Sequence, residues 1–426
     1  MPRERHPWLI KKASHDAAAG ATAELPQERT QGLWLVHGKW YDLQGFASRH
    51  PGGRFWIEET RGMDVTELYE THHLDLRGPD QILEKCLVGP ASPDYRGFYD
   101  YEAKGLYPTL KRRVATALRE SGGNGATPAF RAQCWFVLVA HCVCFATTAA
   151  TGSLWVAAFT GVTISSLHGI GHNFLHRADS WWMYVATVGG WNVHLNRVSH
   201  AISHHPMPNT NWDLEILGHE PWLFNMVDRP ANSRWIVIYG PLLCCSGHLL
   251  DVVFTWSRIL SRRQAFELEM LSNVLQLAAL CYGCGMPRAV LCWCTMFLVF
   301  GAIDAYAGYP LHHTESAWTI GDKSHARKRD MAEHIIAATV DYDVGAMPGW
   351  QSLLCYELMP NHCLHHCFPT VDCSKFPAIR DVFEETLKEF GVQQKLVAQP
   401  YISLQMVPAW LRGTSWYTTA KRLMAV

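Results

Sequence analysis

Apolar segments of membrane-spanning length lie in the middle of the chain, between polar ends. The first two segments, residues 132–150 and 153–171, are separated only by a short polar gap at Thr151-Gly152. A helix needs roughly 20 apolar residues to cross the hydrocarbon core of a bilayer, and each segment is close to that length. Because the gap is short, the pattern predicts a hairpin of two transmembrane helices.

Three further apolar segments follow, at residues 235–256, 267–283 and 288–309. The first contains Gly240-Pro241, His248 and Asp251, which favours a helix that lies in the membrane interface rather than across the membrane. The other two segments flank a glycine-rich turn at 283–287 and are predicted to form a second transmembrane hairpin.

The N-terminal part has a different pattern of shorter segments. Residues 1–32 contain no apolar core of signal-peptide length, and we expect them to form a disordered tail. Short strands are predicted at Leu33–Val36 and Lys39–Leu43, with a turn at His37-Gly38 between them. This region therefore has the pattern of a small water-soluble domain that precedes the apolar segments.

Composition supports a membrane protein with a large polar part. Only 18% of the 426 residues are charged, and the net charge is −1. The lack of a basic surplus argues against nucleic acid as a partner. The 14 cysteines are scattered through the sequence, many of them in apolar runs, so we expect reduced thiols rather than a disulfide framework.

Histidine is abundant, and many of the 23 histidines form three clusters with helical spacing. The clusters are His168, His172 and His176; His200, His204 and His205; and His362, His365 and His366. Residues three or four positions apart share one face of a helix, and neutral imidazole is a common ligand of iron, zinc and copper. The spacing therefore predicts a metal site built from all three clusters.

A motif in the N-terminal region resembles the haem-binding domain of cytochrome b5. Trp40-Tyr41-Asp42-Leu43 is followed by His50-Pro51-Gly52-Gly53, and Asp64-Val65-Thr66-Glu67-Leu68-Tyr69 is followed by His72 and His73. The resemblance implies axial haem ligation by His50 and His73, with His72 as the alternative to His73. Two imidazoles occupy both axial positions of the iron, so such a site transfers single electrons and leaves no position for O₂.

The three histidine clusters resemble the boxes of the integral-membrane fatty acid desaturases, which use non-haem di-iron. Those boxes read His-x-x-x-His, His-x-x-His-His and Gln-or-His-x-x-His-His. Two flanking stretches, Asn209-Thr210 with Asp213 and Glu215, and Phe368-Pro369-Thr370, agree with that family. With the haem module in front, the chain resembles the front-end desaturases, and within them the cytochrome b5-related proteins.

This resemblance also implies a set of iron ligands. A further ligand is expected after the last transmembrane helix; His312 is expected there, with His313 as the alternative. For His176, His194 and His219 a polar role beside the site or at the surface is the alternative to ligation. The implied ligands are His168, His172, His200, His204, His205, His312, His362, His365 and His366.

Three features depart from the family pattern. Gly169 stands where the first box usually has Asp, and His362 begins the third box where most front-end enzymes have Gln. The second box is stretched, so that His200 and His205 are five residues apart, which is about 140° on a regular α-helix. Either this helix is distorted, or one of the two histidines is not a ligand.

The resemblance implies an O₂-dependent fatty acyl desaturase that contains haem b and two iron ions. Its substrate would be an acyl-lipid or an acyl-CoA, and its electrons would come from NADH-cytochrome b5 reductase through the fused haem. The alternatives are a lipid hydroxylase with the same metal site, and a non-catalytic haem- or iron-binding protein on a degenerate scaffold. The implied location is the endoplasmic reticulum membrane, with several membrane passes.

The orientation in the membrane follows from the need to bring all ligands together. Arg258, Arg262 and Arg263 place the start of the second hairpin in the cytosol by the positive-inside rule. The turn at 283–287 is then lumenal, and the haem domain and all three histidine clusters are cytosolic.

The predicted fold is an N-terminal α+β cytochrome b5-like domain followed by an all-α membrane domain with two transmembrane hairpins. The predicted boundaries are 1–32 for the tail, 33–90 for the haem domain, 91–130 for a linker, 131–380 for the membrane domain and 381–426 for C-terminal cytosolic helices and tail.

Overall fold

The computed structural model of the chain describes residues 32–218, 235–319, 330–343, 360–398 and 404–411. The predicted N-terminal tail lies outside the described residues, apart from Gly32. His219 and the end of the C-terminal segment, from residue 412, also lie outside them.

The N-terminal domain is a small α+β unit, as the sequence predicts. Its three-stranded antiparallel sheet has the order β1-β2-β3, and both predicted strands are present. Trp34, Tyr41, Val65 and Tyr69 are buried in its apolar core. The elements are β1 Trp34–Val36, β2 Lys39–Tyr41, η1 Ala47–Arg49, α3 Arg54–Glu59, α4 Thr66–His72, α5 Arg77–Cys86 and β3 Leu87–Pro90.

Helix α6 (Leu106–Glu120) lies within the predicted linker but belongs to the main helical core. Leu106, Leu110, Val114 and Leu118 recur every four residues, and all four are buried. They pack with the C-terminal helix α17 (Phe376–Glu389), far away in the sequence. The segment that connects the two domains therefore contains a helix that packs into the main helical core.

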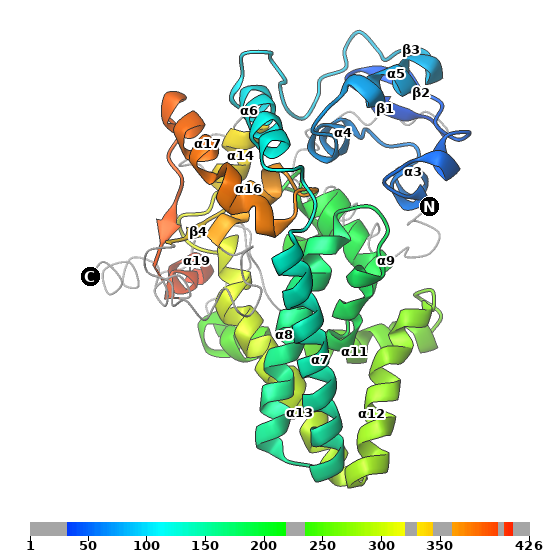
Figure 1. Cartoon of the computed structure of the whole chain (residues 1–426), viewed down its shortest axis with the longest axis vertical. Coiled ribbons are helices and arrows are strands. Elements are labelled where there is room, and N and C mark those ends of the chain that lie inside the picture. The colour runs from blue at the N-terminus through cyan, green and yellow to red at the C-terminus, as the bar shows by residue number, and fades with distance from the viewer. Residues whose placement is uncertain (1–31, 219–234, 320–329, 344–359, 399–403, 412–426) are drawn as a thin grey trace.

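Two antiparallel helix pairs form the elongated lower part of the molecule (Figure 1). They are α7 (Pro128–Thr151) with α8 (Leu154–Leu175), and α12 (Leu271–Cys284) with α13 (Met286–Ala307). The turns of the two pairs lie side by side: the Arg288 side chain at the second turn donates a hydrogen bond to the Gly152 carbonyl at the first. Both predicted hairpins are therefore present, and their turns lie at the same end.

Helix α11 (Ile236–Leu260) crosses the other apolar helices rather than running along them (Figure 1). Its Val252 packs with Phe297 of α13, and its His248 stacks on Phe300 with 4.0 Å between ring centroids. Among the described residues, α7, α8, α11 and residues 286–311 are long and apolar enough to span a membrane, whereas α12 is shorter. Because α11 is one of these candidate spans, its predicted position in the membrane interface stays a prediction.

A layer of short helices covers the end of the bundle opposite the turns (Figure 1). This layer carries the second and third histidine clusters. Its elements are η2 Trp181–Gly189, α9 Val193–Asn196, η3 Arg197–His204, α10 Leu214–Gly218, η5 Leu268–Met270, η6 Tyr309–Leu311, α14 Met331–Ala338, β4 Asp341–Tyr342, α16 His362–Cys367, η9 Cys373–Lys375, β5 Leu396–Val397 and α19 Met406–Leu411. The described cysteines are free thiols.

Candidate metal centre and haem site

Histidines from all three clusters meet in two adjoining, fully buried groups. The ligand atoms of each group lie within 4.8 Å of one another. The first group contains His172, His176, His200, His205 and His365, and the second contains His204, His312 and His366. The groups touch, because the ring of His205 stacks on that of His366 at 4.0 Å.

The second cluster lies on a π-helix, η3, in which the backbone hydrogen bonds run from residue i+5 to residue i. The His205 N–H donates to the His200 carbonyl at 2.9 Å, and the Nε2 atoms of the two rings are 3.0 Å apart. The helix is therefore distorted so that both side chains reach the same group. Of the two alternatives left open by the five-residue spacing, the distorted helix is present, and ligation by both histidines stays a prediction.

The third cluster divides its histidines between the two groups. On α16, His365 Nε2 lies 3.1 Å from His172 Nε2 of the first group. His366 Nε2 lies 3.0 Å from His312 Nε2 of the second group, and His362 Nε2 is 2.7 Å from the same atom. His362 therefore adjoins the second group.

The distances between the Nε2 atoms around His312 distinguish metal ligation from hydrogen bonding. The Nε2 atom of His312 faces the Nε2 atoms of His204, His362 and His366 at 2.7–3.2 Å. A neutral imidazole has one N–H and cannot satisfy three such neighbours. Nitrogens bound about 2.0–2.1 Å from a metal at right angles are about 2.9 Å apart. The arrangement therefore fits metal ligands better than a hydrogen-bonded cluster.

Two carboxylates and a backbone carbonyl hold the Nδ1 atoms of three of these histidines. His204 Nδ1 and His200 Nδ1 each lie 2.9 Å from a carboxylate oxygen, of Asp213 and Glu215 respectively. The Nδ1–H of His312 donates to the Ala338 carbonyl at 3.1 Å. Such partners fix the tautomer in which Nε2 is free to bind a metal.

The same carboxylates make the site favourable for a cation. Burial alone would lower the pKa of His204, but Asp213 and Glu215 raise it to about 9. Asp213 is completely buried. Its negative charge is therefore held close to the second group, where a metal ion would compensate it.

The first cluster differs from the prediction in which two of its three histidines reach the metal groups. His176 lies in the first group, whereas His168 lies in neither. The ring of His168 packs instead against Trp191 and Phe300, at 3.9 Å and 5.0 Å between centroids. Because both histidines are four residues from His172, spacing alone could not distinguish them; His172–His176 is the pair that reaches the site.

If the first box begins at His172 rather than His168, a different residue departs from the family pattern. The position after the first histidine of the box is now Asn173, not Gly169. The Asn173 amide donates to the buried carboxylate of Asp372 at 2.9 Å and accepts from the Cys373 N–H at 3.0 Å. Asn173 therefore connects the first cluster to the chain that follows the third.

The structure also separates the remaining candidates. His312 lies in the second group, whereas His313 packs on Tyr309 with 4.4 Å between ring centroids. His194 lies outside both groups, with its ring 5.4 Å from Phe55 of the N-terminal domain. This agrees with the polar role weighed for His194.

In the N-terminal domain, His50 and His73 face each other across a gap of haem-iron size. Their ring centroids are 6.2 Å apart, and each Nδ1–H donates to a backbone carbonyl at 2.9 Å, of Gly53 and Tyr69 respectively. This leaves both Nε2 atoms free for a metal. Two imidazoles on opposite sides of one iron have centroids roughly 6 Å apart, given metal–nitrogen bonds near 2 Å.

His72 occupies a different place. Its ring packs on Trp56 with centroids 4.7 Å apart, and its Nδ1–H donates to the Leu68 carbonyl at 3.1 Å. The geometry therefore favours His73 over His72 as the partner of His50.

Comparison with known families gives two matches, one to each part of the chain. The model of the fatty acid desaturase family matches residues 129–396, more than half of the chain. The chain belongs to the fatty acid desaturase family. A second model, the cytochrome b5-like haem/steroid-binding domain, matches residues 22–92. This desaturase family member therefore has a fused cytochrome b5-like domain, which implies haem binding.

Curated relatives span nearly the whole chain at low identity. The desaturase family member is 28% identical to a cytochrome b5-related protein of Drosophila melanogaster, over 90% of this chain and 86% of the relative. It is 22% identical to a probable Delta(5) fatty acid desaturase C of Dictyostelium discoideum, with coverages of 86% and 88%. It is 23% identical to an acyl-lipid (8-3)-desaturase of Mortierella alpina, with 94% of both chains covered. No solved structure matches it significantly.

Proposed function

We propose that this protein is a membrane di-iron oxidoreductase that desaturates a fatty acyl chain with O₂ and receives electrons from its own haem domain. The observation that supports this most strongly is the convergence of three distant histidine clusters into two adjoining buried groups. Histidines with purely structural roles have no reason to converge in this way. The fused cytochrome b5-like domain supplies the matching electron donor.

The donor set fits two metal ions. One ion would be held by His172, His176, His200, His205 and His365, and the other by His204, His312, His362 and His366. When bound, two irons activate O₂ to an oxidant that is strong enough to cleave an unactivated C–H bond.

Zinc is the main competitor, because it also binds imidazole. A structural zinc site usually takes four ligands, whereas the two groups and His362 together provide about twice that number. Zinc is redox-inert and would have no use for a one-electron haem donor. These two features favour iron.

The protein contributes position, charge and exclusion of water. Asp213 and Glu215 orient His204 and His200, and the backbone carbonyl of Ala338 orients His312. All three imidazoles are buried, so the reacting centre is shielded from bulk water. Holding nine imidazoles with free nitrogens in a dry cavity is costly unless metals bind there.

We further propose that the haem domain and the histidine layer face the cytosol and that residues 283–287 are lumenal, in the endoplasmic reticulum membrane. The adjacent turns of the two hairpins at the end opposite the histidines support this orientation. The external reductant would be NADH-cytochrome b5 reductase, and the substrate an acyl-lipid or acyl-CoA.

Two alternatives use the same scaffold. A lipid hydroxylase would have the same metal site and a different product. A non-catalytic haem- and iron-binding protein is favoured by the similarity to a protein named only as cytochrome b5-related.

Expression in a host that lacks the activity, followed by full analysis of fatty acids and their hydroxylated and sphingoid forms, tests the proposal. A new double bond that disappears with His204→Ala is the expected result. A new hydroxyl group would select the hydroxylase. An unchanged lipid profile from folded, metal-loaded protein would contradict both enzymatic proposals and favour the non-catalytic one.

A further inference from the structure

The haem domain packs against the same helix that carries the second histidine cluster. Ala201 and Ile202 of η3 share an apolar cluster with Trp56 of α3. Val198 of η3 shares another with Phe55. The helix η3 therefore directs its histidines to the metal groups and other side chains to the haem domain.

Arg197, the first residue of η3, is held rigidly and presented to the haem domain. Its guanidinium donates to the carbonyls of Leu175 and Arg177 and forms an ion pair with Asp179 at 2.6 Å. Its central carbon lies 5.0 Å from the ring centroid of Phe55 and 5.2 Å from that of Trp56. These are cation–π distances.

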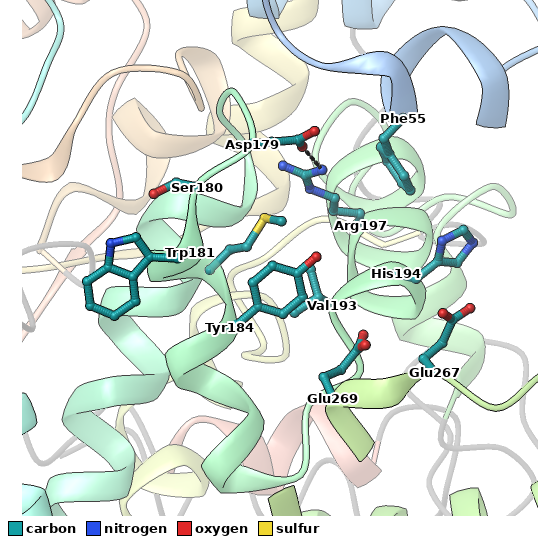
Figure 2. Close-up of a pocket in the computed structure, with 11 residues that line it drawn as sticks. Phe55, Asp179, Ser180, Trp181, Tyr184, Val193, His194, Arg197, Glu267 and Glu269 are labelled. Atoms are coloured by element: carbon teal, nitrogen blue, oxygen red, sulfur yellow. Dashed lines mark hydrogen bonds and ion pairs between the residues drawn. The ribbon is translucent and has the colours of Figure 1, made fainter. Parts of the chain in front are cut away.

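Figure 2 shows Phe55, on the ribbon of the haem domain, beside the Asp179–Arg197 ion pair. These residues line one side of a pocket of about 470 Å³, and Glu269 and Tyr184 lie across it. The haem domain therefore forms part of the wall of a cavity in the membrane domain.

Two further contacts define the docked position. A Cβ atom on Gly53 would lie 2.8 Å from an Asp179 carboxylate oxygen, so the second glycine of the His-Pro-Gly-Gly motif permits this close approach. Glu70 of α4 forms a buried ion pair with Lys111 of α6 at 2.7 Å. Removing one partner of a buried ion pair is strongly destabilising, because the other charge is left buried without compensation.

His72 lies at this boundary, between the two candidate cofactor sites. It is the residue next to His73, and its ring packs on Trp56, which contacts η3. Its buried Nε2 atom has no hydrogen-bond partner among the described residues. His72 is therefore linked to η3 through the ring of Trp56.

We propose that the haem domain is docked permanently on η3 in the position for electron transfer, and that His72 connects the haem to the metal groups. This rests on the proposed di-iron function. With both cofactors bound, one electron would pass from the haem held by His50 and His73 to the metal centre, and no proton or bond would be exchanged. A haem domain that detaches and diffuses between partners is the alternative.

Docking is tested without reference to the metals, by amide hydrogen exchange on the full-length protein. Phe55→Lys places a positive charge against Arg197 and should increase exchange in α3 and η3 several-fold, while the haem absorption spectrum stays unchanged. Val88→Ala, on an exposed residue of β3, is the matched control and should have no effect. Equal exchange of α3 in the wild type and in Phe55→Lys would overturn the docked arrangement.

A charge exchange at the second contact provides an independent check. Lys111→Glu should increase exchange in α4 and α6, because it places two carboxylates in one buried site. Adding Glu70→Lys should restore protection if the ion pair holds the docked position. Failure of both variants to change the exchange would contradict docking through this contact.

The role of His72 is tested by stopped-flow reoxidation of the reduced haem in iron-loaded, full-length protein. His72→Ala should slow reoxidation several-fold with unchanged haem spectrum and midpoint potential, and His72→Phe, which keeps a packed ring, should restore part of the rate. Equal rates in all three proteins would overturn the role of His72. A wild type that stays reduced although hydrogen exchange shows it docked would instead contradict the proposed di-iron function.

Discussion

The Nε2 atoms of His200 and His205 lie 3.0 Å apart although the residues are five positions apart in the sequence. The π-helical turn of η3 makes this possible, and π-helical segments are frequent at functional sites. The same turn places Ala201 and Ile202 against the haem domain. One distorted helix thus connects the two candidate cofactor sites.

Substitution can test whether His176 or His168 of the first cluster binds iron. His176→Ala should remove non-haem iron, because its imidazole belongs to the first group. His168→Ala should retain the iron, because His168 packs against Trp191 outside both groups. Metal analysis of the two purified variants measures this, with the haem spectrum as the control for folding. Loss of iron from His168→Ala alone would instead support ligation by His168, as predicted from the sequence.

The haem ligands can be separated in the same way. In the full-length protein, His50→Ala and His73→Ala should each abolish the low-spin spectrum of bis-imidazole haem, because their rings face each other. His72→Ala should keep that spectrum, because the His72 ring packs on Trp56. The opposite result for His72 and His73 would show that the ligand assignment is wrong.

Removing the carboxylate behind His204 should weaken metal binding without removing a ligand. Asp213→Asn replaces a charged partner of the His204 Nδ1 atom with a neutral one, and partners of this kind contribute about 10–100-fold in metal affinity. Titration with a chelator should reveal easier iron loss. Asp251→Asn, on an exposed residue of α11, is the matched control, and equal chelator sensitivity of the two variants would argue against this role.

The buried carboxyl of Glu67 predicts a pH dependence of haem-domain stability. Burial, and then the neighbouring Asp64, raise the pKa of Glu67 from 4.5 to about 8. Between these values the unfolded chain loses the proton while the folded domain keeps it. The free energy of unfolding should therefore fall as pH rises from about 5 to 8, by roughly 1 kcal/mol per unit, and level off above that range.

Thermal unfolding followed by haem absorbance measures this effect. Glu67→Gln cannot ionise, so its stability should change less over the same pH range. Glu84→Gln, on an exposed residue of α5, should behave like the wild type. If Glu67→Gln and the wild type lose stability equally, the carboxyl of Glu67 is not responsible.

Much of the architecture could be predicted from the sequence, because it depends on local patterns. The hairpins follow from apolar length, and the strands at Trp34 and Lys39 follow from short alternating segments. The haem motif and the histidine clusters have short, fixed spacings. The family model and the relatives confirm the resemblance inferred from these motifs.

What could not be predicted depends on contacts between distant residues. His168 and His176 are equivalent by spacing, and only the packing of Trp191 and Phe300 around His168 separates them. The packing of α6, in the predicted linker, depends on its buried apolar residues meeting α17 more than 250 residues later. Neither the haem motif nor the histidine clusters predict that Phe55 and Trp56 pack on Arg197.

The most direct test of the central claim is the non-haem iron content of purified full-length protein. With haem measured by its spectrum and total iron by elemental analysis, the two histidine groups predict about two irons per chain beyond the haem iron. His204→Ala and His366→Ala should lose this iron while the haem remains. Folded protein that contains only haem iron, or that holds zinc in the histidine groups, would contradict the di-iron account.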